Sequence, residues 1–201
     1  MAYSSFSLRD VEKDFSLTIE EEINLFASTE SLPQSDVLRQ TFAENVSLAL
    51  AINTEKARSE LIVMPLLLEV RRRSPVPISL FSGSEFNVDP EKGLTGYCDY
   101  LVSLSKQQLM ISAPVIAVVE AKNENIKGGL GQCIAEMVAA QIFNRQQGNA
   151  IDTIYGAVTT GEIWKFLKLF NNTIQIDLMD YYIKDVDKIL GILSQAIPKV
   201  A

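Results

Sequence analysis

A carboxylate and an ammonium group stand two residues apart where an apolar run ends. Glu120-Ala121-Lys122 follows the run 115–119, whose composition is that of a buried strand. Residues two apart on a strand point to the same face, so Glu120 and Lys122 should project together from the strand end. Asp99 lies 21 residues upstream, in a second strand-like run, 97–102. Two carboxylates beside a lysine suit metal-dependent hydrolysis of a phosphodiester bond.

Each of these side chains also has an ordinary structural explanation. Asp99 could be a carboxylate at a turn or a strand edge, and Glu120 with Lys122 could form an exposed ion pair. Taken singly, these explanations are the better ones. The three residues together, with this spacing and these flanking strands, favour a site.

The chain contains no histidine. This excludes, within the chain, a Ser-His-Asp or Cys-His nucleophile system, a histidine general base and a zinc site of the His-Glu-x-x-His type. Hydrolytic chemistry would therefore depend on carboxylates, lysine and a hard cation that takes oxygen ligands. Mg²⁺ is the cofactor that we expect, with Mn²⁺ as a possible substitute.

Length and composition predict a single domain, residues 1–201, with 47% apolar and 21% charged residues. The longest apolar runs, 61–68 and 111–119, are too short to span a bilayer, and the first residues lack the pattern of a signal peptide. Cys98 and Cys133 are too few for a disulfide framework. We therefore expect a cytoplasmic protein that does not enter the membrane.

The net charge of −7 argues against a protein that coats nucleic acid by bulk charge. A local basic patch is still compatible with that charge, and ordinary solvated surface charges explain the same residues about equally well. The basic residues concerned are Lys56, Arg58, Arg71, Arg72, Arg73, Lys122 and Lys127.

Periodicity and turn residues predict an α/β sandwich with a mixed sheet. The first fifty residues are predicted to be helical, with a capping box at Thr18 and Glu21 and a helix cap at Ser35. The next helix, capped by Asn53 or Thr54, should kink or restart at Pro65. The remaining predicted elements are strands 78–81, 97–104 and 115–121, a helix 128–146, strands 154–159, 163–170 and 173–178, and a helix 185–196.

The segments 94–99 and 119–122 resemble the second and third motifs of the PD-(D/E)xK nuclease superfamily, whose members share the restriction-endonuclease-like fold. The resemblance implies an αβββαβ core, here 54–178, with an N-terminal helical extension, 1–53, and a C-terminal helix, 179–201. The segment 154–166 is similar to the region after the catalytic core in restriction subunits of type I enzymes.

This resemblance implies a role for each candidate site residue. Asp99 and Glu120 would hold Mg²⁺ together with Glu60 from the preceding helix. Lys122 would orient or activate a water molecule. Gln132, from the following helix, would position metal-bound water or the phosphate, although a polar residue in a first helical turn explains it equally well.

Glu60 and Glu69 compete for the role on the preceding helix. Nine residues along an unbroken helix make about half a rotation, so both cannot face the sheet. Arg72 and Arg73 lie three and four residues after Glu69, a favourable exposed pairing. We therefore interpret Glu69 as a surface salt-bridge residue and Glu60 as the residue turned toward the site.

Other residues near the site have simpler interpretations. Cys98 and Cys133 are predicted to be buried thiols, with Cys98 on the strand face opposite Asp99. Trp164 is expected to pack in the core or an interface. The stretch 128–131 is not a phosphate-binding P-loop, because no Gly-Lys-Ser/Thr follows it, and it is expected to add flexibility before a helix.

Three functions follow from the sequence. The first is a Mg²⁺-dependent nuclease that acts on DNA, as a homodimer or with a partner protein that supplies DNA affinity. The second is a catalytically silent subunit of the same fold, with a regulatory or assembly role in DNA restriction, recombination or mobile-element control. The third is a plain interaction module with scattered surface charges.

Overall fold

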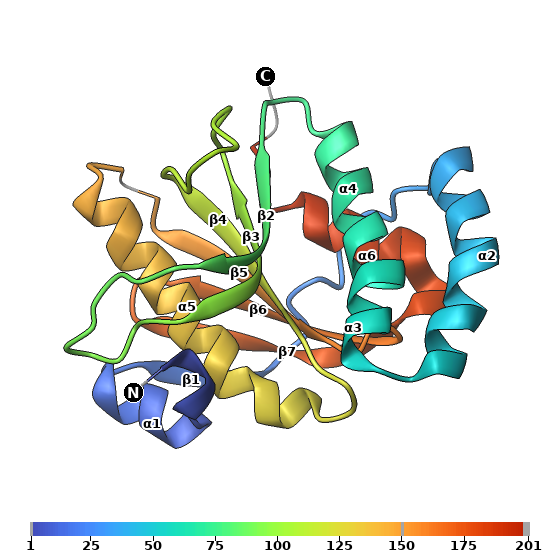
Figure 1. Ribbon diagram of the computed structural model, residues 1–201. Helices are drawn as coiled ribbons and strands as arrows, with labels where there is room; N and C mark the ends of the chain where they lie inside the picture. Colours follow the sequence, from blue (N-terminus) through green and yellow to red (C-terminus); the bar gives the residue numbers. More distant parts are fainter. Residues whose placement is uncertain (1, 150, 199–201) are drawn as a thin grey trace.

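The computed structural model describes residues 2–149 and 151–198 and consists of one seven-stranded mixed sheet between two layers of helices (Figure 1). The predicted α/β architecture with a mixed sheet is confirmed. The strand order is β1-β7-β6-β5-β4-β3-β2. The strands are β1 (Thr18–Ile23), β2 (Ser79–Glu85), β3 (Tyr97–Ser103), β4 (Val115–Ala121), β5 (Thr153–Thr159), β6 (Ile163–Phe170) and β7 (Thr173–Tyr182).

Helices cover both faces of the sheet. Helix α5 (Ile126–Gln146) lies along one face, with α1 (Leu8–Asp14) and the short helix η1 (Tyr3–Ser5) packed on it. The other face carries α2 (Asp36–Ile52), α4 (Met64–Arg73) and α6 (Val186–Ser194). The short elements α3 (Glu55–Arg58), η2 (Ser59–Val63) and η3 (Ile183–Asp185) complete the helical layers.

The pairing of the strands places the end of β4 in the centre of the sheet. Strands β2, β3 and β4 form an antiparallel meander, and α5 then crosses over so that β5 lies parallel to β4. Strands β5, β6 and β7 are antiparallel, and β1 lies parallel to β7 at the edge. The predicted order of helix, three strands, helix and strand from residue 54 onward is present.

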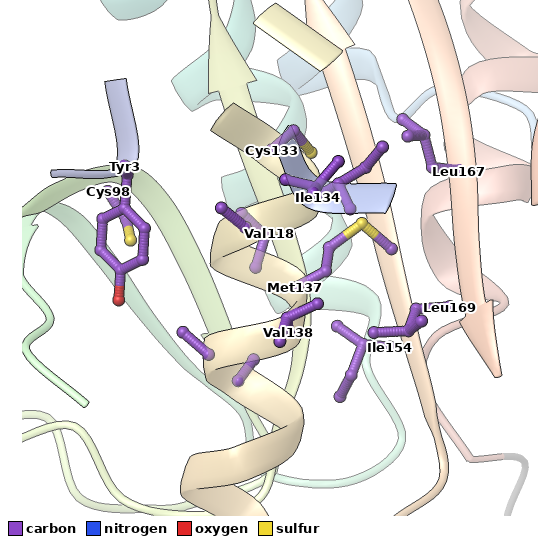
Figure 2. Packing of buried hydrophobic residues seen from close by; sticks show 14 of the residues in the cluster. Tyr3, Cys98, Val118, Cys133, Ile134, Met137, Val138, Ile154, Leu167 and Leu169 are labelled. Carbon is purple, nitrogen blue, oxygen red and sulfur yellow. The ribbon is translucent and has the colours of Figure 1, made fainter. Parts of the chain in front are cut away.

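Two apolar cores lie on the two faces of the sheet. Figure 2 shows one of them, in which side chains of α5, including Ile134 and Met137, pack against Val118 of β4 and Leu167 of β6. Ile134, Met137 and Val138 of α5 are buried. Helix α5 is also buried on much of its outer side, because α1 and η1 cover it.

The prediction that the first fifty residues are helical is wrong for residues 18–23. This segment forms β1, which pairs in parallel with β7, so Thr18 does not cap a helix there. The backbone edge of β7 outweighs the helix preference of three consecutive glutamates. Charged residues on such an edge strand also discourage pairing with other chains.

The helix caps follow the sequence more closely. The Ser35 side chain accepts a hydrogen bond from the Leu38 N–H at 3.2 Å and caps α2. Thr54 caps α3 through the Ala57 N–H at 3.2 Å, while Asn53 ends α2 in the left-handed region. Pro65 lies in the first turn of α4, directly after the π-helical turn η2. The expected restart of the helix at Pro65 is therefore confirmed, since proline lacks the N–H that would continue the ladder.

Tight turns with positive φ at Gly161 and Asn171 join β5 to β6 and β6 to β7. Strand β7 continues to Tyr182, so the expected C-terminal helical segment, 179–201, begins as a strand. The ends of the predicted single domain, residue 1 and residues 199–201, lie outside the described residues.

The glycine-rich stretch 128–131 does not precede helix α5 but lies within it. A Cβ atom at Gly129 would lie 2.8 Å from a Val158 methyl group and 3.0 Å from the Lys122 side chain. A Cβ atom at Gly131 would clash with the backbone of Ser7. These glycines provide close packing around the N-terminal end of α5, rather than the flexibility expected from the sequence.

Candidate functional site

Asp99 lies where strands β3 and β4 separate. The register between these strands runs as far as Tyr100 opposite Val119, although β3 starts at Tyr97 and β4 continues to Ala121. Beyond that point the Asp99 carboxylate accepts a hydrogen bond from the Ala121 N–H at 2.8 Å. The side chain thus replaces a backbone acceptor and is held beside Glu120.

Glu120 and Lys122 meet, as their spacing predicts. The Glu120 side chain is 1% exposed and the Lys122 side chain is 25% exposed. The Lys122 ammonium donates a hydrogen bond to Glu120 Oε1. The exposed ion pair considered as an alternative is therefore wrong for Glu120, whose carboxylate is buried.

Helix α5 adds two polar side chains to this pair. Lys122 Nζ lies 3.2 Å from Gln132 Oε1, and Gln132 Nε2 donates to Glu136 Oε1 at 3.1 Å. Gln132 is therefore brought to the site, as the sequence suggested. Glu136 is fully buried and was not predicted as a site residue. Its sequence signal is a carboxylate within an apolar helical stripe, one turn after Gln132.

Negative charge is in excess at this site. Burial, followed by the nearby Asp99 carboxylate, raises the pKa of Glu120 from 4.5 to about 8, against the opposing effect of Lys122. Burial alone would lower the pKa of Lys122, but the Glu120 carboxylate outweighs it and the pKa is raised. Burial and then Glu120 raise the pKa of Glu136 well above its usual value.

Two buried oxygens of this site lack a partner. Within the described residues, neither Glu120 Oε2 nor Glu136 Oε2 has a hydrogen-bond partner. Buried carboxylate oxygens are normally satisfied by a donor or a cation. Glu120 therefore has one oxygen engaged by Lys122 and a second oxygen available to a positively charged group.

Glu60 does not take the place predicted for it. Its side chain is 63% exposed and pairs with Lys56 at 3.8 Å. In the described part of the chain, no three acidic, cysteine or histidine side chains lie close enough to form a metal cluster. The expected ligand set of Asp99, Glu120 and Glu60 is thus reduced to its first two members.

Glu55, which is not among the predicted site residues, is an acidic residue of the preceding helix whose charge reaches the site. Its charge contributes to the pKa rise at both Glu120 and Lys122, whereas the charge of Glu60 contributes at Tyr100. Glu55 is the first residue of α3, directly after its cap Thr54. An acidic residue right after a capping threonine was the available signal.

Glu69 does form the predicted pairs with Arg72 and Arg73, at 2.5 and 2.9 Å, but it is not a surface residue. Its side chain is completely buried and also accepts hydrogen bonds from the Ser35 N–H and hydroxyl, at 3.2 and 2.9 Å. Glu69 therefore ties α4 to the beginning of α2. The arginines that follow it neutralise this buried carboxylate and are not a free basic patch.

Cys98, Cys133 and Trp164 are buried, as predicted. The Trp164 indole donates a hydrogen bond to the Gly161 carbonyl at 3.1 Å and stacks on Phe166. None of these side chains is available to a ligand. None of the helices in the described part of the chain is both long and apolar enough to cross a bilayer.

Comparison of the chain with family models, with curated proteins and with solved structures finds no match. The central residues of the site are Asp99 and Glu120, with Lys122 between Glu120 and Gln132.

Proposed function

We propose that the protein is a Mg²⁺-dependent nuclease of the PD-(D/E)xK type that hydrolyses phosphodiester bonds in DNA. The observation that carries the proposal is the convergence of Asp99, Glu120 and Lys122 where β3 and β4 separate. The order of elements from α3 to β5, with the antiparallel meander and the parallel β4–β5 pair, supports a restriction-endonuclease-like core.

The carboxylates fit a hard divalent cation. Glu120 has a buried oxygen without a partner, and Asp99 is positioned on the neighbouring strand. Mg²⁺ prefers oxygen ligands and is usually bound by one or two carboxylates together with substrate phosphates. Asp99 and Glu120 would hold the ion, which supplies a bound water of lowered pKa and positive charge beside the phosphate. Mn²⁺ suits the same ligands.

Lys122 contributes charge rather than base catalysis. Because Glu120 raises its pKa, the side chain remains an ammonium at neutral pH. An ammonium that is 25% exposed and held by Glu120 and Gln132 can donate to a phosphate oxygen at the mouth of the site. Preorganised positive charge of this kind stabilises the negative charge that develops during phosphodiester cleavage.

Affinity for DNA is expected to come from more than one chain. The net charge is −7, and Arg72 and Arg73 are engaged with Glu69. Arg58 donates to the Thr160 carbonyl at 3.0 Å and to Asn53 at 2.8 Å. We therefore expect a homodimer, or a partner protein, to complete the DNA-binding surface.

A cleavage assay with matched variants tests the proposal. Single-stranded, double-stranded and branched DNA are incubated with Mg²⁺, with Mn²⁺ or with EDTA. Asp99→Asn keeps an oxygen that can accept from the Ala121 N–H but removes the charge, so the variant should fold and lose cleavage by at least about 100-fold. Lys122→Met should show a similar loss. Glu60→Gln is the control, because the Glu60 side chain is exposed and pairs with Lys56, and the variant should cleave like wild type.

The outcomes separate the alternatives. Cleavage by Asp99→Asn at the wild-type rate would contradict the assigned site. An equal loss in Glu60→Gln would restore Glu60 to the ligand set. Folded wild-type protein that binds Mg²⁺ but cuts none of the substrates would favour the catalytically silent subunit.

A further inference from the structure

Glu136 is a completely buried carboxyl group to which the proposed reaction assigns no role. It lies on α5, one helical turn after Gln132, and its neighbours along the helix, Ala135 and Met137, are fully buried. Placing a carboxyl group there costs free energy unless its partners compensate. Its one hydrogen-bonded contact in the described chain is the Gln132 side chain, at 3.1 Å.

The two neighbours of the Gln132 amide allow one orientation. An ammonium group has donors only, so Lys122 needs the amide oxygen. The Glu136 oxygen accepts from the amide nitrogen. If the amide were turned over, its NH₂ group would face the Lys122 ammonium, and two donors would oppose each other. Lys122 thus sets the orientation in which Gln132 Oε1 faces it at 3.2 Å, and the contact with Glu136 holds the amide there.

We propose that Glu136 is a positioning residue that locks the Gln132 amide so that its oxygen holds the Lys122 ammonium beside Glu120. The inference rests on the proposed function, because it assigns a purpose to the placement of Lys122. Without the lock, Gln132 can rotate and Lys122 is held by Glu120 alone. An ammonium held by Glu120 alone is less well positioned to donate to a phosphate oxygen. We therefore expect a lower turnover number and unchanged DNA binding.

Two substitutions of Glu136 separate positioning from structural support. Glu136→Gln can still accept from Gln132 Nε2 through its own amide oxygen. Glu136→Leu keeps the buried volume but removes the acceptor, and it should fold at least as stably as wild type, since an apolar side chain replaces a buried carboxyl group. We expect Glu136→Leu to lower kcat about tenfold with KM for DNA unchanged, and Glu136→Gln to retain wild-type turnover.

A double variant tests whether the effect passes through Gln132. If Glu136 acts by orienting this amide, Gln132→Ala combined with Glu136→Leu should be no slower than Gln132→Ala alone. Additive losses would overturn the inference, as would wild-type kcat in Glu136→Leu.

A measurement without catalysis keeps this inference separate from the proposed function. In ¹H–¹⁵N spectra, the Gln132 side-chain NH₂ protons should be protected from solvent exchange in wild type and Glu136→Gln but not in Glu136→Leu. This pattern in a protein that cleaves no DNA would support the orientation and reject only the nuclease. Unchanged protection in Glu136→Leu would overturn the orientation itself.

Discussion

Replacing Glu120 by glutamine should change how the stability of the protein depends on pH. The pKa of Glu120 is raised from 4.5 to about 8 on folding, because of burial and the Asp99 carboxylate. Each pKa unit corresponds to about 1.4 kcal/mol, so this carboxyl group weakens the native state by roughly 5 kcal/mol as the pH rises from 4.5 to 8. Glutamine in its place carries no titrating charge and removes this loss.

The direction of the effect follows from proton binding. Below pH 4.5 Glu120 is protonated in both states, and its favourable contribution to stability is fully present. Between pH 4.5 and about 8 the folded protein keeps a proton that the unfolded chain has released, so unfolding becomes easier as the pH rises. Above about pH 8 both states are ionised and the dependence levels off.

The neighbouring charges do not reverse this expectation. Glu136 is present in wild type and in the variant. Because Glu120 contributes to the raised pKa of Glu136, the substitution also reduces the contribution of Glu136 to the change of stability with pH. Lys122 has a raised pKa in wild type, so it remains protonated throughout this pH range. Without Glu120, burial would lower the pKa of Lys122. This would further reduce the loss of stability of the variant as the pH rises.

Urea denaturation followed by circular dichroism, in EDTA, measures the difference. Between pH 5 and pH 8 the unfolding free energy of wild type should fall relative to that of Glu120→Gln by about 4 kcal/mol. Glu60→Gln serves as the control, because the Glu60 side chain is 63% exposed. The unfolding free energy of this variant should depend on pH as that of wild type does. Parallel pH profiles for wild type and Glu120→Gln would refute the reasoning that Glu120 is buried in a charge-rich site.

Two further substitutions test the packing that holds the site. Gly131→Ala should destabilise the protein by about 1–3 kcal/mol in the same urea assay, because the added Cβ would lie 2.6 Å from the Ser7 carbonyl carbon. Wild-type stability of this variant would show that α1 can move away. Glu69→Ala should lower the unfolding free energy by about 3 kcal/mol, since it removes the buried carboxylate that accepts from Ser35 and pairs with the arginines. A loss of stability below about 1 kcal/mol would contradict the structural role of Glu69.

The sequence predicted the contact between Glu120 and Lys122 and the strands that carry Asp99 and Glu120, but it missed strand β1. Glu120 and Lys122 were placed correctly because the two-residue period of a strand is insensitive to small errors in its ends. Strands β3 and β4 were predicted nearly to the residue, since their apolar runs are bounded by turn residues. Strand β1 was missed because its glutamates carry no strand pattern, and its pairing with β7 joins segments about 150 residues apart, a contact that no local pattern reports.

The error at Glu60 lies in the choice between two glutamates, not in their relative orientation. Glu69 is buried and accepts from Ser35, while Glu60 is exposed beside Lys56, so the two lie on opposite sides, as half a rotation requires. Arg72 and Arg73 indicated an exposed pairing, whereas they pair with a buried carboxylate. Arginines three and four residues after a glutamate are compatible with either arrangement, so the sequence did not decide which glutamate is buried.

The buried carboxylates are the part of the molecule that stability alone does not explain. Glu120 ends an otherwise apolar strand, and Glu136 interrupts an apolar helix, yet each has an oxygen without a partner in the described chain. Asp99 adds a third carboxylate, and the Lys122 ammonium donates to Glu120. Buried carboxylates that are incompletely paired are typical of functional sites, in line with the proposed function. A divalent cation between Asp99 and Glu120 would supply the missing positive charge. Added Mg²⁺ should therefore stabilise wild type more strongly at pH 8 than at pH 6. It should not stabilise Glu120→Gln at either pH.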